Sequence, residues 1–281
     1  RVMACGHGGQ ILVDGLTAGL LSGVHLVELG PRRLRDITKP VDIFQVQAPG
    51  LRTEFPPLTT LDPAHGNVRP YTTSFVGRDT ELGDVCTAVR ARRLVTLTGV
   101  GGVGKTRLAL EVAERLAGEF PDGVWVTAFA AVGDPAAVPD AVAAVLGIKQ
   151  QPGMTLAESV ATTLEGRSRL LVLDNCEHVL DAAADLIEAI LSHSATVHIL
   201  ATSREGLGVD HEQLWPVPPL EADTGVDSVA AALFVERAHD VAPGISFSSA
   251  EESVAVAEIC RRLDGIPLAI ELAASRMVSM T

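Results

Sequence analysis

The segment LVTLTGVGGVGKTRLAL, from Leu94 to Leu110, constrains the fold more than any other part of the sequence. An apolar run that ends at Gly99 predicts a buried strand, and the apolar residues that recur after Thr106 predict a helix. The glycines between them are conformationally costly, so the fold or a ligand has to require them. The sequence therefore predicts a strand, a glycine-rich turn and a helix in direct succession.

The turn has the spacing of a phosphate-binding loop, because Gly99 is followed after four residues by Gly104, Lys105 and Thr106. Glycines let backbone N–H groups converge on phosphate oxygens, and the positive end of the following helix faces the same oxygens. Lys105 adds a full charge, and the Thr106 hydroxyl suits Mg²⁺. Lys105 is also one of three lysines among 22 basic residues, which favours a chemical role. The alternative is a glycine-rich turn followed by a coincidental Lys-Thr pair.

A second apolar strand, RLLVLDN, ends in an acidic residue, Asp174. Because an α/β sheet binds its ligands at the carboxyl ends of its strands, we expect Asp174 to lie near the glycine loop. There it would hold Mg²⁺ through water, as the second acid does in phosphate-loop NTPases. The alternative is an aspartate that only caps the following helix.

Strands and helical stretches alternate after residue 70, which predicts a mostly parallel α/β sheet with helices on both faces. The order resembles the NTPase branch in which a further strand lies between the glycine-loop strand and the Asp174 strand. TVHILATSR, residues 196–204, would be that inserted strand, and Arg204 at its end could sense an outer phosphate. A surface arginine at a strand end is the alternative.

The chain divides by composition into four parts. Residues 1–48 read as three strands, QILVDG, GVHLVELG and PVDIFQV, and 49–70 form a linker with five prolines. A phosphate-loop NTPase domain is predicted over 71–222, and a small helical subdomain over 223–281. The helix after the glycine loop is expected to stop near Gly118.

Six motifs in order resemble one family: SFVGRDTEL, the glycine loop, LLVLDNCEH, LATSRE, LWPVPPL and LDGIPLAIELAA. Together they cover residues 71–281 and are similar to the nucleotide-binding module of STAND ATPases, the group that includes NB-ARC domains. Large actinobacterial transcriptional regulators of the LuxR type look most similar. The resemblance implies that ADP holds a closed state, and that exchange for ATP permits opening and assembly.

The resemblance also implies the residues of a site. Val76, Gly77 and Arg78 match the segment that touches the adenine side, and Pro267 matches a proline that packs near the base. The implied ATP/ADP-binding set is completed by Gly99, Gly101, Gly102, Val103, Gly104, Lys105, Thr106 and Arg107; the metal set is Thr106 and Asp174; the catalytic set is Lys105, Asp174, Asn175 and Arg204.

Asn175 departs from the pattern of fast hydrolases in this branch, which often place a glutamate directly after the aspartate. An amide can orient a water molecule but is a poor general base, so we expect slow, Mg²⁺-dependent ATP hydrolysis by a switch. Glu177, two residues on, could compensate or could begin the next helix. His178 beside it reads more readily as a helix-start residue than as a general base.

The first 48 residues resemble the last, α+β part of a class III adenylate or guanylate cyclase domain. In that family an arginine stabilises the transition state, and Arg1 could be that arginine. The metal-binding acids of the family are absent, so no cyclase activity is expected from this segment. A cyclase of which the ATPase is an accessory regulatory module is the alternative function.

Bulk composition limits the partners of the chain. Its net charge of −13 argues against direct nucleic-acid binding by this chain. The resemblance to LuxR-type regulators implies a DNA-binding helix-turn-helix after Thr281. Four scattered cysteines, no long apolar run and no signal peptide predict a cytoplasmic protein without membrane contact. Other domains of the same polypeptide, and a nucleotide-dependent oligomer, are the expected partners.

Overall fold

The computed structural model describes residues 2–21, 23–32, 41–48, 52–53, 55, 66–69, 71–223, 225–245, 247 and 249–279. The chain folds into two compact units, Arg1–His65 and Gly66–Thr281. Arg1 and most of the linker predicted over 49–70 lie outside the described residues. None of the helices in the described part of the chain has the length and apolar character needed to cross a bilayer.

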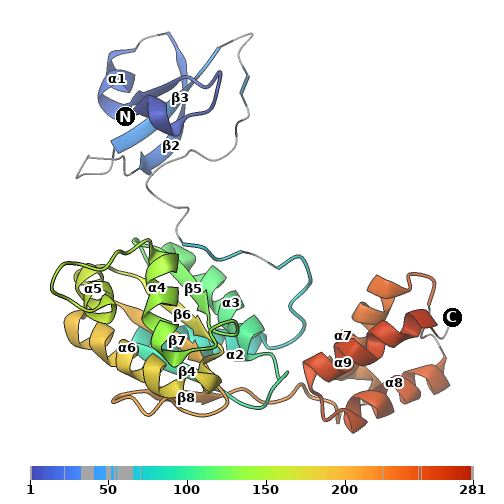
Figure 1. The fold of residues 1–281 in the computed structure, drawn as a ribbon. Coiled ribbons are helices and arrows are strands. Elements are labelled where there is room, and N and C mark those ends of the chain that lie inside the picture. The colour runs from blue at the N-terminus through green and yellow to red at the C-terminus, as the bar shows by residue number, and fades with distance from the viewer. Residues whose placement is uncertain are drawn as a thin grey trace. The chain divides into compact units, whose positions relative to one another are not determined.

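The first unit contains a three-stranded antiparallel sheet in the order β1-β3-β2 (Figure 1). Each of the three stretches predicted as strands supplies one. The elements are η1 (Val2–Cys5), β1 (Leu12–Asp14), α1 (Gly15–Leu20), β2 (His25–Arg32) and β3 (Val41–Gln47). Buried Gln45 is satisfied, because its oxygen accepts from Gln10 and its nitrogen donates to the Thr53 carbonyl. The cyclase-like assignment of this unit stays a prediction.

The second unit is built on a five-stranded parallel sheet in the order β5-β6-β7-β4-β8 (Figure 1). β7 pairs with both β4 and β6, which confirms the prediction of an inserted strand between them. The strands are β4 (Leu94–Thr98), β5 (Val124–Ala128), β6 (Leu170–Asp174), β7 (His198–Thr202) and β8 (Gln213–Pro216).

Helices cover both faces of this sheet, as the alternation along β6 requires. Leu170 and Val172 pack with α2 (Asp79–Ala91) and α3 (Lys105–Leu116) on one face. Leu171 and Leu173 pack on the other face with a second group of helices. That group is α4 (Val138–Leu146), α5 (Leu156–Thr163) and α6 (Leu180–His193).

The edge strand β5 is covered by Gly66 and Asn67, the first residues of the second unit. Gly66 pairs with Val124, and the side-chain amide of Asn67 donates to the Val126 carbonyl and accepts from the Val126 N–H. The side chain of Asn67 thus takes the place of a strand backbone. Such covering removes the unpaired groups that an edge strand otherwise exposes.

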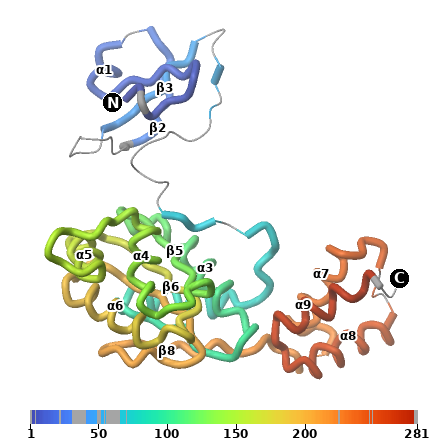
Figure 2. The backbone as a smooth tube through the Cα atoms, in the orientation of Figure 1, coloured from blue at the N-terminus to red at the C-terminus, as the bar shows by residue number. Residues whose placement is uncertain are grey.

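Three helices follow the sheet: α7 (Val229–Val241), α8 (Ala250–Arg262) and α9 (Pro267–Ser275), orange to red in Figure 2. They share a core that includes Phe234, Cys260 and Ile270. Ser249 and Glu252 form a capping box at the start of α8, and Pro267 occupies the first turn of α9, where its missing N–H costs nothing.

The helix after the glycine loop ends close to Gly118, as predicted. Its last residue is Leu116, and Gly118 lies inside a 3₁₀ turn, Ala117–Glu119, that continues from it. The last turn tightens because Ala117 keeps helical backbone angles and its N–H donates to the Glu114 carbonyl.

Candidate functional site

The glycine loop joins β4 to α3 at the carboxyl edge of the sheet, and three of its glycines, at positions 99, 102 and 104, have positive φ angles at which another residue would be strained. Gly104 is the N-cap of α3 and has a φ of 97°. Gly102 has a φ of 77°, and a Cβ on it would lie 2.9 Å from the Cβ of Leu268. The loop therefore presents bare backbone close to the first turn of α9, whose Leu268 N–H donates to the Gly102 carbonyl.

Lys105 begins α3 and is only 8% exposed. Its ammonium donates to the carbonyls of Gly99, at 2.7 Å, and Val100, at 3.1 Å. Burial lowers the pKa of Lys105, while the nearby carboxylates of Glu177 and Asp174 oppose that shift. Among the described residues no carboxylate lies within ion-pair distance of this ammonium, so a buried cation is paired only with neutral oxygens.

Asp174, at the end of β6, is held by two threonine hydroxyls. Thr106 and Thr202 each donate to its Oδ1 at 2.7 Å. Its Oδ2 receives no hydrogen bond from the described part of the chain. The loop, the Asp174 strand and the inserted strand thus meet at one point, which is where parallel strands bring their carboxyl ends together.

Arg78 lies beneath the loop in a left-handed conformation, with a φ of 77°, and is 8% exposed. Its Nη2 donates to the carbonyls of Val103, at 2.9 Å, and Pro218, at 2.7 Å. Its Nη1 is buried without a hydrogen-bond partner in the described structure. Burial lowers the pKa of Arg78. A buried donor left unsatisfied is costly, so this nitrogen calls for an acceptor.

A cleft of 790 Å³ collects most of the residues predicted for the site. This volume is in the range of small-molecule sites. The predicted residues that line it are Val76, Arg78, Gly101, Gly102, Gly104, Lys105, Thr106, Arg107, Asn175 and Pro267.

Five predicted residues do not line the cleft. Asp174 accepts a hydrogen bond from Thr106, which lines the cleft, and the Gly99 carbonyl accepts one from the Lys105 ammonium. Val103 is fully buried in the core. The remaining two are Gly77, where a Cβ would lie 2.3 Å from Val229 Cγ1, and Arg204, which pairs with Glu177.

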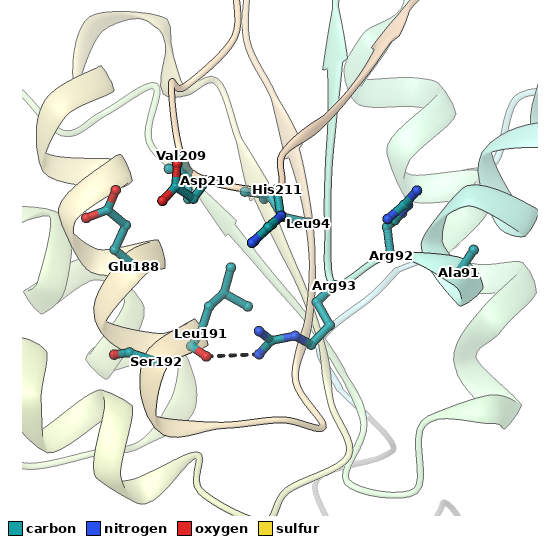
Figure 3. Close-up of a pocket in the computed structure, with 10 residues that line it drawn as sticks. All are labelled: Ala91, Arg92, Arg93, Leu94, Glu188, Leu191, Ser192, Val209, Asp210 and His211. Atoms are coloured by element: carbon teal, nitrogen blue, oxygen red, sulfur yellow. Dashed lines mark hydrogen bonds between the residues drawn. The ribbon is translucent and has the colours of Figure 1, made fainter.

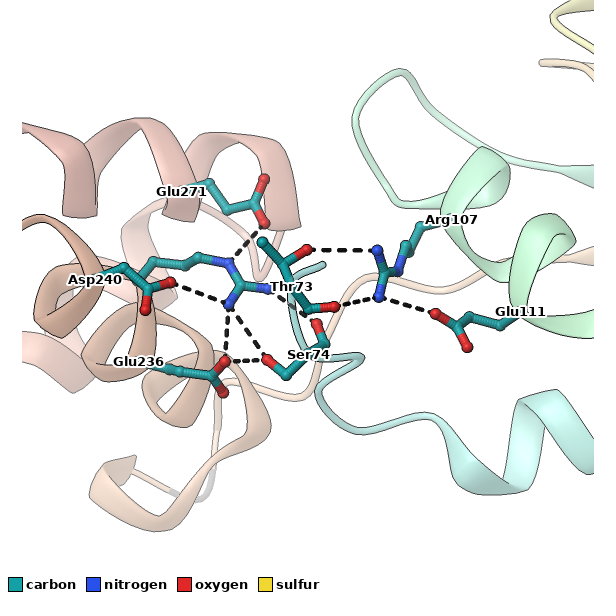
Figure 4. A network of polar contacts seen from close by, with 8 residues as sticks. Thr73, Ser74, Arg107, Glu111, Glu236, Asp240 and Glu271 are labelled. Atoms are coloured by element: carbon teal, nitrogen blue, oxygen red, sulfur yellow. Dashed lines mark hydrogen bonds and ion pairs between the residues drawn. The ribbon is translucent and has the colours of Figure 1, made fainter. Parts of the chain in front are cut away.

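Arg107 takes contacts that the sequence did not indicate. Its guanidinium lies 4.0 Å from the centroid of the Tyr71 ring. It donates to the Thr73 carbonyl at 2.7 Å and pairs with Glu111 at 2.8 Å (Figure 4). The segment Tyr71–Phe75 therefore lies against the first turns of α3 and also lines the cleft.

The same segment is tied to the helices that follow the sheet by Arg237, which sequence reasoning missed. Figure 4 labels its partners Ser74, Glu236, Asp240 and Glu271. Arg237 donates to the Ser74 carbonyl at 3.0 Å and pairs with Glu271 of α9 at 3.2 Å. It also pairs with Glu236 and Asp240 on its own helix, at 2.9 and 3.6 Å. No local spacing signals this network, because its members come from three distant parts of the chain.

Replacing Arg237 with alanine is expected to lower the free energy of unfolding by about 1–2 kcal/mol, because three carboxylates then lose their shared cation. Urea denaturation of the whole chain measures this change. The matched control is Arg262→Ala, an exposed ion-paired arginine expected to change stability by less than about 0.5 kcal/mol. Equal effects of the two substitutions would contradict a structural role for the network.

A second cleft, of 580 Å³, lies at the amino-terminal edge of the same sheet (Figure 3). Arg93, just before β4, donates to the Leu191 carbonyl there, and Asp210 and His211 precede β8. None of the predicted site residues lines it. Ligands of open α/β sheets bind at the opposite edge, so the cleft at the glycine loop is the candidate site.

Residues 84–209 match the NB-ARC domain family. This part of the chain is similar to NB-ARC domains. The match contains the glycine loop, Asp174, Asn175 and Arg204, whereas Val76–Arg78 and Pro267 fall outside it. The fold agrees, because the parallel sheet flanked by helices is that of a phosphate-loop NTPase. A Walker-type ATPase of Pyrococcus abyssi superimposes with a TM-score of 0.51 and 13% identity over 76% of this chain and 71% of that one.

Curated relatives match two thirds or more of the chain. An uncharacterized protein of Mycobacterium tuberculosis is 44% identical over 75% of this chain and 52% of its own length. A putative HTH-type transcriptional regulator of the same organism is 44% identical over 67% of this chain and 21% of its own length. Regulatory protein AfsR of Streptomyces coelicolor is 31% identical over 78% of this chain and 22% of its own length. The chain thus spans about half the length of the first of these relatives and a fifth of the others.

Proposed function

We propose that the unit Gly66–Thr281 is an ATP/ADP-binding switch of a multidomain transcriptional regulator, with slow Mg²⁺-dependent ATP hydrolysis. The observation that carries the proposal is the buried Lys105 ammonium, which stands at the start of a helix and has no ion-pair partner among the residues that the structure describes. Burying an unpaired cation is expensive, and a polyphosphate in the cleft would supply the missing negative charge.

The residues present fit a nucleotide with its metal. The glycine loop and Lys105 would bind the phosphates, and Mg²⁺ would be held by the Thr106 hydroxyl and, through water, by Oδ2 of Asp174. When bound, the metal neutralises phosphate charge. Val76, Arg78 and Pro267 line the part of the cleft where the nucleoside would bind, and Nη1 of Arg78 is buried without a hydrogen-bond partner in the described structure.

The contact between the loop and α9 supports a switch. Leu268 of α9 both donates to the Gly102 carbonyl and packs against that glycine. Consider an equilibrium between two positions of α9. A ligand on the loop shifts this equilibrium only by the difference between its binding free energies for the two positions. Nearly complete reversal of a two-state equilibrium needs a difference of about 5.5 kcal/mol, and a terminal phosphate near Lys105 and Arg204 is a credible source.

The names of the relatives and the charge of −13 shape the rest of the proposal. We expect the protein to be cytoplasmic and not to bind nucleic acid through these residues. DNA binding, of LuxR type, would belong to another part of the regulator. The expected partners are the nucleotide, neighbouring domains of the same polypeptide and further copies in a nucleotide-dependent oligomer.

Nucleotide binding is expected to raise the free energy of unfolding by about 2.7 kcal/mol at a ligand concentration 100 times the Kd. The Tm would rise by several degrees. Calorimetric titration with ADP and ATP, with and without Mg²⁺, followed by thermal unfolding, measures both effects. Identifying any nucleotide released from the purified protein completes the test. No heat of binding and no shift in Tm with either nucleotide would refute the proposal.

A further inference from the structure

The turn after β6 directs Glu177 toward the cleft. Asn175 takes a left-handed conformation with a φ of 64°, and the 3₁₀ helix η4 (Cys176–His178) follows. Cys176 is fully buried, and burial raises the pKa of its thiol to about 12, so this residue anchors the turn as an inert apolar group. The next side chain, Glu177, lines the cleft beside Lys105 and Thr202.

Arg204 holds the Glu177 carboxylate with one of its nitrogens. Its Nε donates to Oε1 of Glu177 at 3.1 Å. Its two terminal nitrogens make no hydrogen bond to the described residues, and Nη2 lies 4.0 Å from a Cβ built on Gly101 of the glycine loop. One guanidinium therefore contacts the glutamate on one side and faces the loop with its remaining donors on the other.

The side chain of Asn175, the residue next to Asp174, is hydrogen-bonded to His178. His178 Nε2 contacts two carbonyl oxygens, those of Phe129 at 2.9 Å and Val132 at 3.0 Å, so this nitrogen carries the proton. His178 Nδ1 is then an acceptor, and it lies 3.3 Å from Nδ2 of Asn175. The amide of Asn175 is thus fixed by His178, and an amide cannot take up a proton as a base. With Asp174 assigned to the metal, Glu177 is the other carboxylate at this end of the cleft among the residues that the structure describes.

We propose that Glu177 is the general base of this site and that Arg204 couples it to the terminal phosphate. The inference rests on the proposed function. The oxygen of a water molecule attacks the γ-phosphorus, the bond from that phosphorus to the bridging oxygen of ADP breaks, and Glu177 takes up the proton of the water. The products are ADP and inorganic phosphate. Arg204 positions the carboxylate through Nε while its terminal nitrogens bind the γ-phosphate.

The test compares Glu177→Gln with the wild-type chain in single-turnover ATP hydrolysis, with ATP and ADP affinities measured separately by calorimetry. The expected result is a fall in the hydrolysis rate of about 100-fold or more, with the Kd of ATP changed by less than about threefold. The matched control is Glu165→Gln, an exposed glutamate outside the cleft, with unchanged hydrolysis. Asn175→Ala is expected to retain more activity than Glu177→Gln.

The coupling is tested with Arg204→Lys, which keeps the charge but lacks Nε. It is expected to slow hydrolysis in the wild-type background and to have a smaller effect in the Glu177→Gln background, because the part of its role that acts through the carboxylate is then already lost. An unchanged rate in Glu177→Gln, or a larger loss in Asn175→Ala, would overturn the assignment of the base. Additive effects would overturn the coupling. Wild-type protein that binds no nucleotide would instead refute the proposed function.

Discussion

Replacing Lys105 with alanine is expected to weaken ATP binding by about 2–5 kcal/mol, the range for removing one member of a buried charge pair. This loss corresponds to a Kd that is higher by a factor between about 30 and several thousand. The loss should fall on affinity and not on stability. Burial lowers the pKa of Lys105, so the folded protein alone gains nothing from keeping this ammonium charged, and alanine is a good helix former at that position.

Calorimetric titration with Mg²⁺-ATP and denaturation in urea separate the two effects of this substitution. Lys149→Ala is the matched control, because it removes an exposed lysine that does not line the cleft. It should leave both affinity and stability unchanged. If Lys105→Ala kept the wild-type Kd, or lost affinity only in proportion to lost stability, Lys105 would not bind the phosphates.

The sheet was predictable because its signals are local and strong. Strands such as Leu94–Thr98 and Leu170–Asp174 are buried on both faces, so the sequence shows them as continuous apolar runs between turn residues. The glycine loop can be recognised in the sequence because its glycines, lysine and threonine stand at fixed spacing. Once both were recognised, the strand between them and the meeting of Lys105, Thr106 and Asp174 followed from the rules of parallel sheets.

The rest of the site depends on tertiary contacts that leave no local trace. Arg78 is positioned by carbonyls 25 and 140 residues further along the chain, those of Val103 and Pro218. Arg237 is tied to Ser74 across 163 residues. Glu177 could be weighed from the sequence as a base or as a helix start. Its ion pair with Arg204 became visible only when β6 and β7 were adjacent.

Replacing Gly265 with alanine is expected to lower the free energy of unfolding by about 3 kcal/mol and to weaken nucleotide binding as well. Gly265 has a φ of 64°, which costs an alanine about 1 kcal/mol, and the added Cβ would lie 2.0 Å from the Leu220 carbonyl oxygen. Moving that backbone costs a further 1–3 kcal/mol or so. The Leu220 N–H donates to the Gly265 carbonyl at 2.9 Å. The backbone segments around Leu220 and Gly265 therefore cannot move apart without losing this hydrogen bond.

Affinity should fall because Gly265 sets the start of α9, where Pro267 lines the cleft and the Leu268 N–H donates to the loop carbonyl of Gly102. Gly118→Ala is the matched control: nothing lies within 4 Å of its added Cβ, and the expected change in stability is below about 1 kcal/mol. Urea denaturation and ATP titration of both variants measure the two effects. If Gly265→Ala unfolded like Gly118→Ala, the tight crossing at Leu220 would not exist in solution. If it lost stability but kept the wild-type Kd, the contact between α9 and the glycine loop would carry no coupling to the nucleotide.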